Sequence, residues 1–434
     1  MASVFVNSVP LGYMSVVPLV YLLEIGYSPV TIGVIYAASG IANTVGYAPF
    51  GFFADRFGRK RFLIIGSVLP ALAYGIFGLT LNPLLLIVAS IVGGVGLAGG
   101  LATAISSPSL LPLLADSSPN EHRTPLFAAY QGVYTVGLSA GSFLSFLPSL
   151  LGSSLSQTSV TAHSESYFIM SLLILGSVIP LLFVTERRKG RAVLPESVSP
   201  QSTALQGLVS GERPNEESSS ERGRGAVTSW SKIAKFSLIM GISGLGFGTI
   251  IQLLPTWYNL KFGVSEGTVG FWMAAAQLLS LVALPTIPFL VRRRGTVNVA
   301  VTAGLVSCIP LIIMPFSVSF ELAASLFVAR SIFMSINVPV FQSYVAGAVS
   351  ERERATTFGV VFTAWGVSNS IGTFLAGDLL GANLLILPFV IGVAAYLGYS
   401  TFFFFFFRGR RLPEEMQVSP VVPDSIPPSH FEQV

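Results

Sequence analysis

The feature that most constrains this chain is the repetition of apolar runs about twenty residues long, bounded by charges, Pro, Gly or Asn. A run of that length crosses the roughly 30 Å hydrocarbon core of a bilayer as a helix. Only 10% of the residues are charged, against about 25% in soluble domains. The sequence predicts twelve spans, near 3–25, 32–54, 62–80, 84–114, 124–150, 167–185, 233–258, 267–291, 296–316, 320–349, 355–380 and 384–407.

Two polar segments divide the chain. Residues 186–232 carry many charges and serines without a long apolar run, which is typical of a flexible linker. They separate an N-terminal half, 1–185, from a C-terminal half, 233–407, each with six spans, and 408–434 forms a tail. The first span starts almost at Met1 without a basic segment before it or a cleavage motif after it, which favours a retained helix over a signal peptide.

The cations indicate how the chain is oriented. With twelve spans, every Lys and Arg except Lys261, in an outer loop, and Arg330, inside span ten, falls on the side that holds both termini. Cytoplasmic loops keep such an excess of cations. We therefore expect a multi-pass protein of the plasma membrane with both termini and the linker in the cytoplasm. Topology accounts for the net charge of +4, so we expect no nucleic-acid partner.

The two halves resemble each other in sequence. "PLVYLLEIGYSPVTIG" (18–33) aligns with "PTWYNLKFGVSEGTVG" (255–270) without a gap, with seven identities in sixteen positions. "RTPLFAAYQGVYTVGLSAGSFL" (123–144) aligns with "RATTFGVVFTAWGVSNSIGTFL" (354–375). Spans one and seven, and five and eleven, are therefore expected to be repeats in the same orientation. Two parallel six-helix repeats around a central site form one large class of secondary transporters.

The segment "GFFADRFGRKR" between spans two and three carries the most specific motif. It resembles the G-x-x-x-D-R-x-G-R-[KR]-[KR] signature of the major facilitator superfamily, matched at Gly51, Asp55, Arg56, Gly58, Arg59, Lys60 and Arg61. The resemblance extends over all twelve spans and implies a transporter fold of two six-helix repeats. It also implies that this motif is a cytoplasmic latch against span eleven, where Arg354 and Thr356 are candidate neighbours. For Lys60 and Arg61 we favour simple anchoring of the topology.

Arg330 is the only Lys or Arg placed well inside a span. An ionisable residue in the membrane is expensive and is a functional hypothesis by default. The resemblance implies that span ten lines a central cavity, and Asn337 and Tyr344 follow Arg330 at i+7 and i+14 on one helical face. Two interpretations stay open: Arg330 binds an anionic group of a substrate, or it forms an ion pair with Asp378 or Glu24.

Other polar residues in the spans are weaker candidates. Glu24 and Asp378 lie near outer helix ends, where a carboxylate for proton coupling and a simple rim charge are alternatives. Gln131, Gln252 and Gln277 are candidates for substrate contact, with hydrogen bonding between helices as the alternative. The histidines, His122, His163 and His430, are expected in loops or the tail. The glycine-rich segments 93–100 and 241–248 are expected in mid-helix, for close packing or bending.

The sequence thus favours a transporter of a small organic or anionic metabolite, working by alternating access as a monomer in the lipid bilayer, with a proton or ion as a candidate co-substrate. A multidrug efflux antiporter is the alternative, although span four lacks a basic residue and "GLSAG" (137–141) stands where the antiporter motif is expected. A membrane sensor would need a folded output domain, and an enzyme would need paired acids, a Ser/His set or metal ligands within spans. We expect no enzymatic activity, no cofactor and no metal site; the single cysteine, Cys308, lies in an apolar run.

Overall fold

The computed structural model describes residues 1–116, 123–183, 230–349 and 351–408, and within these ranges every regular element is a helix. We call α1 to α10 the first lobe. Its helices are α1 (Ala2–Met14), α2 (Val17–Glu24), α3 (Pro29–Phe57), α4 (Arg59–Leu79), α5 (Pro83–Gly93), η1 (Gly96–Ala98), α6 (Gly100–Asp116), α7 (Arg123–Phe143), η3 (Leu144–Phe146), α8 (Leu147–Leu155), α9 (Ser159–Gly176) and α10 (Val178–Leu182).

The second lobe contains α12 to α19. Its helices are α12 (Trp230–Ile250), α13 (Leu254–Phe262), α14 (Glu266–Ala283), η5 (Leu284–Thr286), α15 (Ile287–Arg294), α16 (Thr296–Ile313), η6 (Met314–Phe316), α17 (Phe320–Ala348), α18 (Glu351–Gly381) and α19 (Leu387–Phe407). Most of the predicted linker and all but the first residue of the predicted tail lie outside the described residues.

Eleven stretches in the described residues are long and apolar enough to cross a membrane. They correspond to the predicted spans except the fourth, which the structure divides into α5 and α6. The prediction of an all-helical membrane protein is confirmed by this architecture.

The division of the fourth span corrects the expectation that residues 93–100 continue a helix. Gly94 and Gly99 have φ angles of 87° and 86°, which side-chain-bearing residues rarely adopt. A Cβ on Gly96 would lie 2.7 Å from the Cα atom of Ser15, so the break also lets two backbones approach closely. The other glycine-rich segment, 241–248, stays helical within α12, as expected.

Spans one and seven are each interrupted at equivalent positions. The first breaks at Ser15 and Val16, and the seventh at residues 251–253. Pro18 and Pro255, which align in the repeat, lie in the first turn of α2 and of α13, where a missing backbone N–H does no harm. Pro18 cannot donate to the carbonyl of Met14, and the hydroxyl of Tyr36 donates to that oxygen instead, at 2.9 Å.

The turn between spans five and six lies elsewhere than predicted. The fifth span continues through α8 to Leu155, and α9 begins at Ser159 instead of near residue 167. His163 is therefore buried inside a helix, whereas we expected it in a loop. The first residues of α9, up to Thr161, are exposed, and the polar residues after them are satisfied within the protein: the Ser164 hydroxyl donates to the carbonyl of Gly78, and Ser166 is buried.

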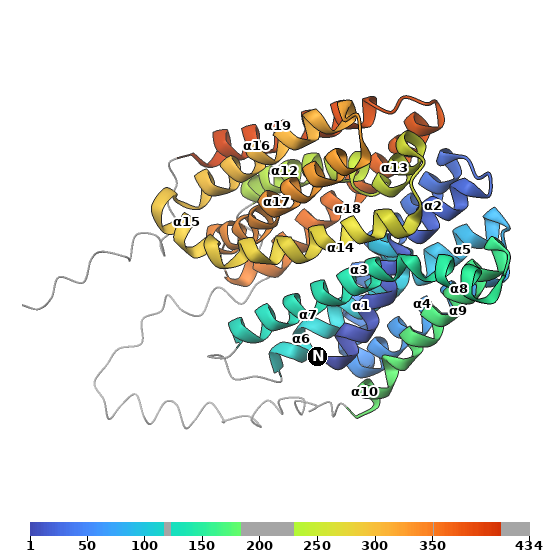
Figure 1. The fold of residues 1–434 in the computed structure, drawn as a ribbon. Coiled ribbons are helices and arrows are strands. Elements are labelled where there is room, and N and C mark those ends of the chain that lie inside the picture. The colour runs from blue at the N-terminus through green and yellow to red at the C-terminus, as the bar shows by residue number, and fades with distance from the viewer. Residues whose placement is uncertain (117–122, 184–229, 350, 409–434) are drawn as a thin grey trace, which may run out of the picture.

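The two lobes meet at one end of the molecule and diverge toward the other (Figure 1). We call the end where α2 and α13 lie the far face, and the end where α6, α10 and α15 terminate the basic face. Between the lobes, α18 packs against α3, α14 against α7, and both α13 and α14 against α2. The far face is therefore where the lobes are joined.

Candidate functional site

Close backbone contact joins the lobes near the far face. A Cβ on Gly33 of α3 would lie 2.9 Å from the Cα atom of Gly377 of α18, so only glycine fits there. Small residues of this kind let membrane helices approach closely. The hydroxyl of Thr256 donates to the carbonyl of Leu19 at 2.9 Å, beside the breaks in spans seven and one. The contact is therefore both apolar and hydrogen bonded.

Farther from that face, hydrogen bonds continue between α7 and α14. The Ser139 hydroxyl donates to the carbonyl of Ala274 at 3.0 Å, and the Gln277 amide donates to the Ser142 hydroxyl at 3.2 Å. Gln277, a sequence candidate, thus joins the two lobes, although its amide oxygen is buried without a hydrogen-bond partner. Gln277 therefore forms a hydrogen bond between helices and also has an acceptor for substrate contact, the two roles that the sequence suggests for it.

Gln252 lies at the break between α12 and α13. Its side chain is 4% exposed, and its amide oxygen has no hydrogen-bond partner. Asn43 of α3 and Asn369 of α18 likewise have buried amide oxygens without partners. A buried polar group that lacks a partner is costly. With Gln277 and Gln157, these are the described amides whose side-chain oxygen is buried without a hydrogen-bond partner.

A histidine and a glutamate meet between the lobes near the far face. His163 of α9 and Glu266 of α14 are both buried, with Nε2 of the imidazole 3.4 Å from a carboxylate oxygen. The ring of Tyr21 stacks on the imidazole at a centroid distance of 3.8 Å. The sequence does not predict this pair, because the predicted sixth span begins near residue 167, after His163. Thr158, whose hydroxyl accepts from the backbone N–H of Thr161 as a helix cap, was the signal for the earlier start.

Arg330 is 4% exposed and points into the second lobe. Its guanidinium donates to the hydroxyl of Tyr396 at 2.8 Å and lies over the same ring, while its Nε has no hydrogen-bond partner. In the described part of the chain it forms no ion pair with Glu24 or Asp378, so that alternative is wrong for this conformation. Glu24 and Asp378 are themselves exposed near the far face.

Asn337 and Tyr344 share the face of α17 that carries Arg330. The Asn337 amide donates to the carbonyl of Ala300 at 2.9 Å and accepts from the hydroxyl of Tyr399 at 2.7 Å. Tyr344 packs edge-on against Phe403. The partners belong to α16 and α19, so these contacts hold the second lobe together. Gln131, the remaining candidate, is exposed on α7.

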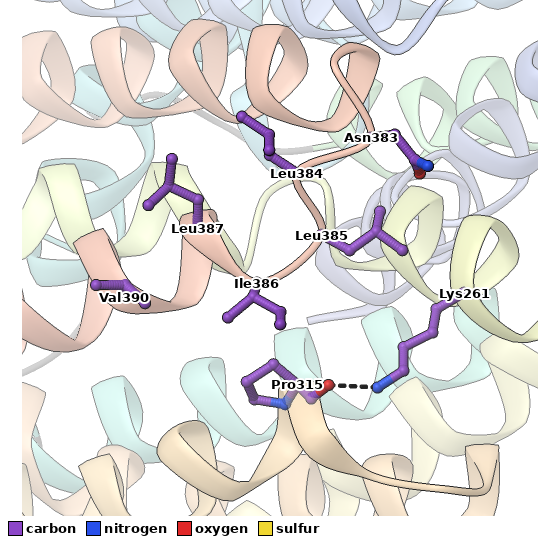
Figure 2. A pocket seen from close by; sticks show the side chains of 8 residues that line it. All are labelled: Lys261, Pro315, Asn383, Leu384, Leu385, Ile386, Leu387 and Val390. Carbon is purple, nitrogen blue, oxygen red and sulfur yellow. Dashed lines mark hydrogen bonds between the residues drawn. The ribbon is translucent and has the colours of Figure 1, made fainter.

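Figure 2 shows a cavity of about 510 Å³ in the second lobe, lined by Lys261, Pro315, Asn383, Leu384, Leu385, Ile386, Leu387 and Val390. Lys261, which we expected in a loop, lies in the last turn of α13 and donates to the carbonyl of Pro315. All lining residues belong to the second lobe near the far face. None of the residues that line it belongs to the breaks in spans one and seven.

The sequence profile described as Major Facilitator Superfamily matches residues 1–235 and again residues 236–429. The chain belongs to the Major Facilitator Superfamily. The two matches confirm the two repeats inferred from the internal alignment.

Relatives in this superfamily are transporters. An uncharacterised superfamily transporter of Methanocaldococcus jannaschii is 20% identical over 91% of this chain and 95% of its own length. An arabinose-proton symporter of Bacillus subtilis is 29% identical over 27% of this chain and only 24% of its own, and the quinolone resistance protein NorA of Staphylococcus aureus is 24% identical over 44% and 46%. The structure of a D-xylose-proton symporter superposes with a TM-score of 0.67 at 14% identity, covering 95% of this chain and 97% of that one, which confirms the fold. The coarse function is membrane transport.

The superfamily motif lies where α3 turns into α4. Gly58 has a φ of 103° and precedes the first residue of α4, so the turn requires glycine. Arg56 is exposed, with its guanidinium over the ring of Phe57. Lys60 donates to the carbonyl of Leu182 at 2.7 Å, near the end of α10. The side chains of Asp55, Arg59 and Arg354 lie outside the described residues, so the latch stays a prediction.

Proposed function

We propose that this chain carries a small polar organic solute across the membrane by alternating access between its two lobes. The observation that carries the proposal is the pair of repeat-related breaks at Ser15 and Gln252. Interrupted helices in equivalent positions of two repeats mark the binding sites of many secondary transporters, because the interrupted backbone and its neighbours contact the solute. The transport class of the relatives supports the same assignment.

The unpartnered amides favour a neutral solute with several hydroxyl or N–H groups. Asn43, Gln252, Gln277 and Asn369 are uncharged and have buried amide oxygens, and a solute of this class would pair with those oxygens. The anionic class that the sequence suggested relied on Arg330, whose guanidinium donates through Nη2 to Tyr396 within the second lobe. Loss of solute affinity in Arg330→Lys at an unchanged melting temperature would restore that class.

The contacts described above support a conformation that is closed at the far face. We place the far face outside the cell and the basic face in the cytoplasm, because the cations segregate to the basic face. In this orientation the conformation is inward-facing. The motif residues Gly51, Asp55, Arg56, Gly58 and Arg59 are proposed to latch the cytoplasmic side in the opposite conformation. Labelling of Ser429→Cys from outside intact cells would contradict this orientation.

A thermal-shift screen of the purified protein over neutral polyols, sugars, nucleosides and anionic metabolites tests the solute class. A bound solute raises the melting temperature in proportion to the logarithm of its concentration over Kd. We expect Gln252→Leu to lose that shift, since the amide is replaced by an apolar group of similar size. Gln157→Leu, at the turn before α9, is the matched control and should keep it. Equal shifts in both variants would contradict a role for the break.

Drug efflux is the second candidate, favoured by the similarity to NorA. Against it, Gly137 and Gly141 of the segment "GLSAG" pack against α1: a Cβ on Gly141 would lie 1.8 Å from the carbonyl oxygen of Val9. Close packing against α1 therefore explains the presence of both glycines without an antiporter motif. Thermal shifts with hydrophobic cations, and none with polar solutes, would favour efflux.

A further inference from the structure

The described chain contains one buried ionisable pair that joins the two lobes, His163 with Glu266. Each partner comes from a different lobe and lies within the first two turns of its helix at the far face. Separation of the lobes at this face would pull the two side chains apart. The pair is therefore located where a change of conformation would be sensed.

The hydrogen bonds of the imidazole fix where its exchangeable proton can lie. Nδ1 is 2.7 Å from the carbonyl oxygen of Ser159, and since a carbonyl only accepts, Nδ1 carries a hydrogen. Nε2 lies 3.4 Å from a Glu266 carboxylate oxygen and has no hydrogen-bond partner. Without a proton between them, a lone pair of Nε2 would face an anionic oxygen in a buried place, which is unfavourable. A proton on either group would remove this repulsion and make the contact attractive.

The surroundings of the pair are consistent with a proton site. Tyr21 of α2 stacks on the imidazole and fixes its plane, and Glu24 of α2 is close enough to act electrostatically on both partners. Tyr13 of α1 and Tyr167 of α9 are also close enough to Glu266 to interact with its charge. Glu165 of α9 is engaged by the amide of Gln157, and Lys261 of α13 by the carbonyl of Pro315.

We propose that His163 and Glu266 form a proton-binding site that is complete only when the far face is closed, so that closing takes up one proton and opening releases it to the water at that face. The inference rests on the alternating access proposed above and adds a site for its proton. Because the closed form binds the extra proton, its population should increase as the pH falls, by up to about tenfold per pH unit.

Spin labels at Leu81→Cys and Val318→Cys report the distance between the lobes at the far face. Leu81 and Val318 are exposed in loops of the first and second lobe, and the native Cys308 is buried. Distances are measured from pH about 5 to 8, the range in which an unperturbed imidazole titrates. In the wild type we expect the fraction of short distances to fall with rising pH.

Two substitutions replace the shared proton by a permanent donor. In Glu266→Gln the amide donates to Nε2, and in His163→Gln the amide donates to Glu266, so the bridge no longer needs a titrating proton. Both variants should keep the short distance and lose the pH dependence. Glu165→Gln is the control, because Glu165 lies on the same helix but accepts a hydrogen bond from Gln157. This variant should keep the pH dependence of the wild type.

The outcomes separate this site from the proposed function. If two distances are observed and their relative populations do not change with pH, the proton site is contradicted and alternating access is not. A pH dependence that persists in both Glu266→Gln and His163→Gln, or that disappears in Glu24→Gln alone, also overturns it. A single population under all conditions, with and without solute, overturns both proposals.

Discussion

At the scale of single residues, Arg330 depends on one hydrogen-bonding neighbour. A lone Arg in an apolar span indicates a costly group that needs a partner, and Arg330 is buried as that argument requires. The partner is Tyr396, sixty-six positions away along the chain. The spacing of polar residues places Arg330, Asn337 and Tyr344 on one face of a helix, but it does not say which neighbour that face meets.

Replacing Tyr396 tests the account of Arg330. We expect Tyr396→Phe to lower the free energy of unfolding by about 1 to 3 kcal/mol, because it removes a hydrogen bond to a buried charged group whose Nε already lacks a partner. Tyr47→Phe is the control, since Tyr47 is 42% exposed. The measurement is unfolding in detergent. Equal stability of the two variants would show that Arg330 does not depend on this contact.

At the scale of helices, the breaks follow from proline and glycine. Pro18 and Pro255 occupy aligned positions, and a helix starts at each of them. Other prolines, such as Pro70 and Pro310, stay inside helices. The sequence thus predicts the repeat but not which prolines interrupt a span. The glycines of 93–100 stand out in the sequence, but their positive φ angles and the close approach of Gly96 to Ser15 are seen only in the structure.

The break in the fourth span predicts a large effect of a small substitution. In Gly94→Ala the new Cβ would lie 2.2 Å from the carbonyl oxygen of Gly99, and φ is 87°. We expect a loss of about 1 to 3 kcal/mol in stability, and more if the backbone cannot shift. Gly132→Ala is the matched control: it is helical in α7 and its Cβ would meet nothing within 4 Å. There we expect a gain of roughly 0.5 to 1 kcal/mol, because alanine favours helix over glycine. Equal melting temperatures would contradict the strained turn.

For the whole molecule, apolar runs, cation placement and the repeat were enough to predict the architecture. Each of these signals is local or repeats along the chain. The contacts between lobes are different, since they pair residues from opposite halves, such as Thr256 with Leu19 and His163 with Glu266. Neither helical periodicity nor a motif encodes such pairings. The sequence therefore predicted the lobes and did not predict how they are joined.

Alternating access is the central claim, and two distances measured together test it most directly. One label pair, Leu81→Cys with Val318→Cys, spans the far face, and the other, Phe183→Cys with Trp230→Cys, spans the basic face; all four residues are exposed. Addition of a transported solute or a change of pH should lengthen one distance and shorten the other in the same fraction of molecules. Two distances that stay fixed, or that lengthen and shorten together, would contradict the account.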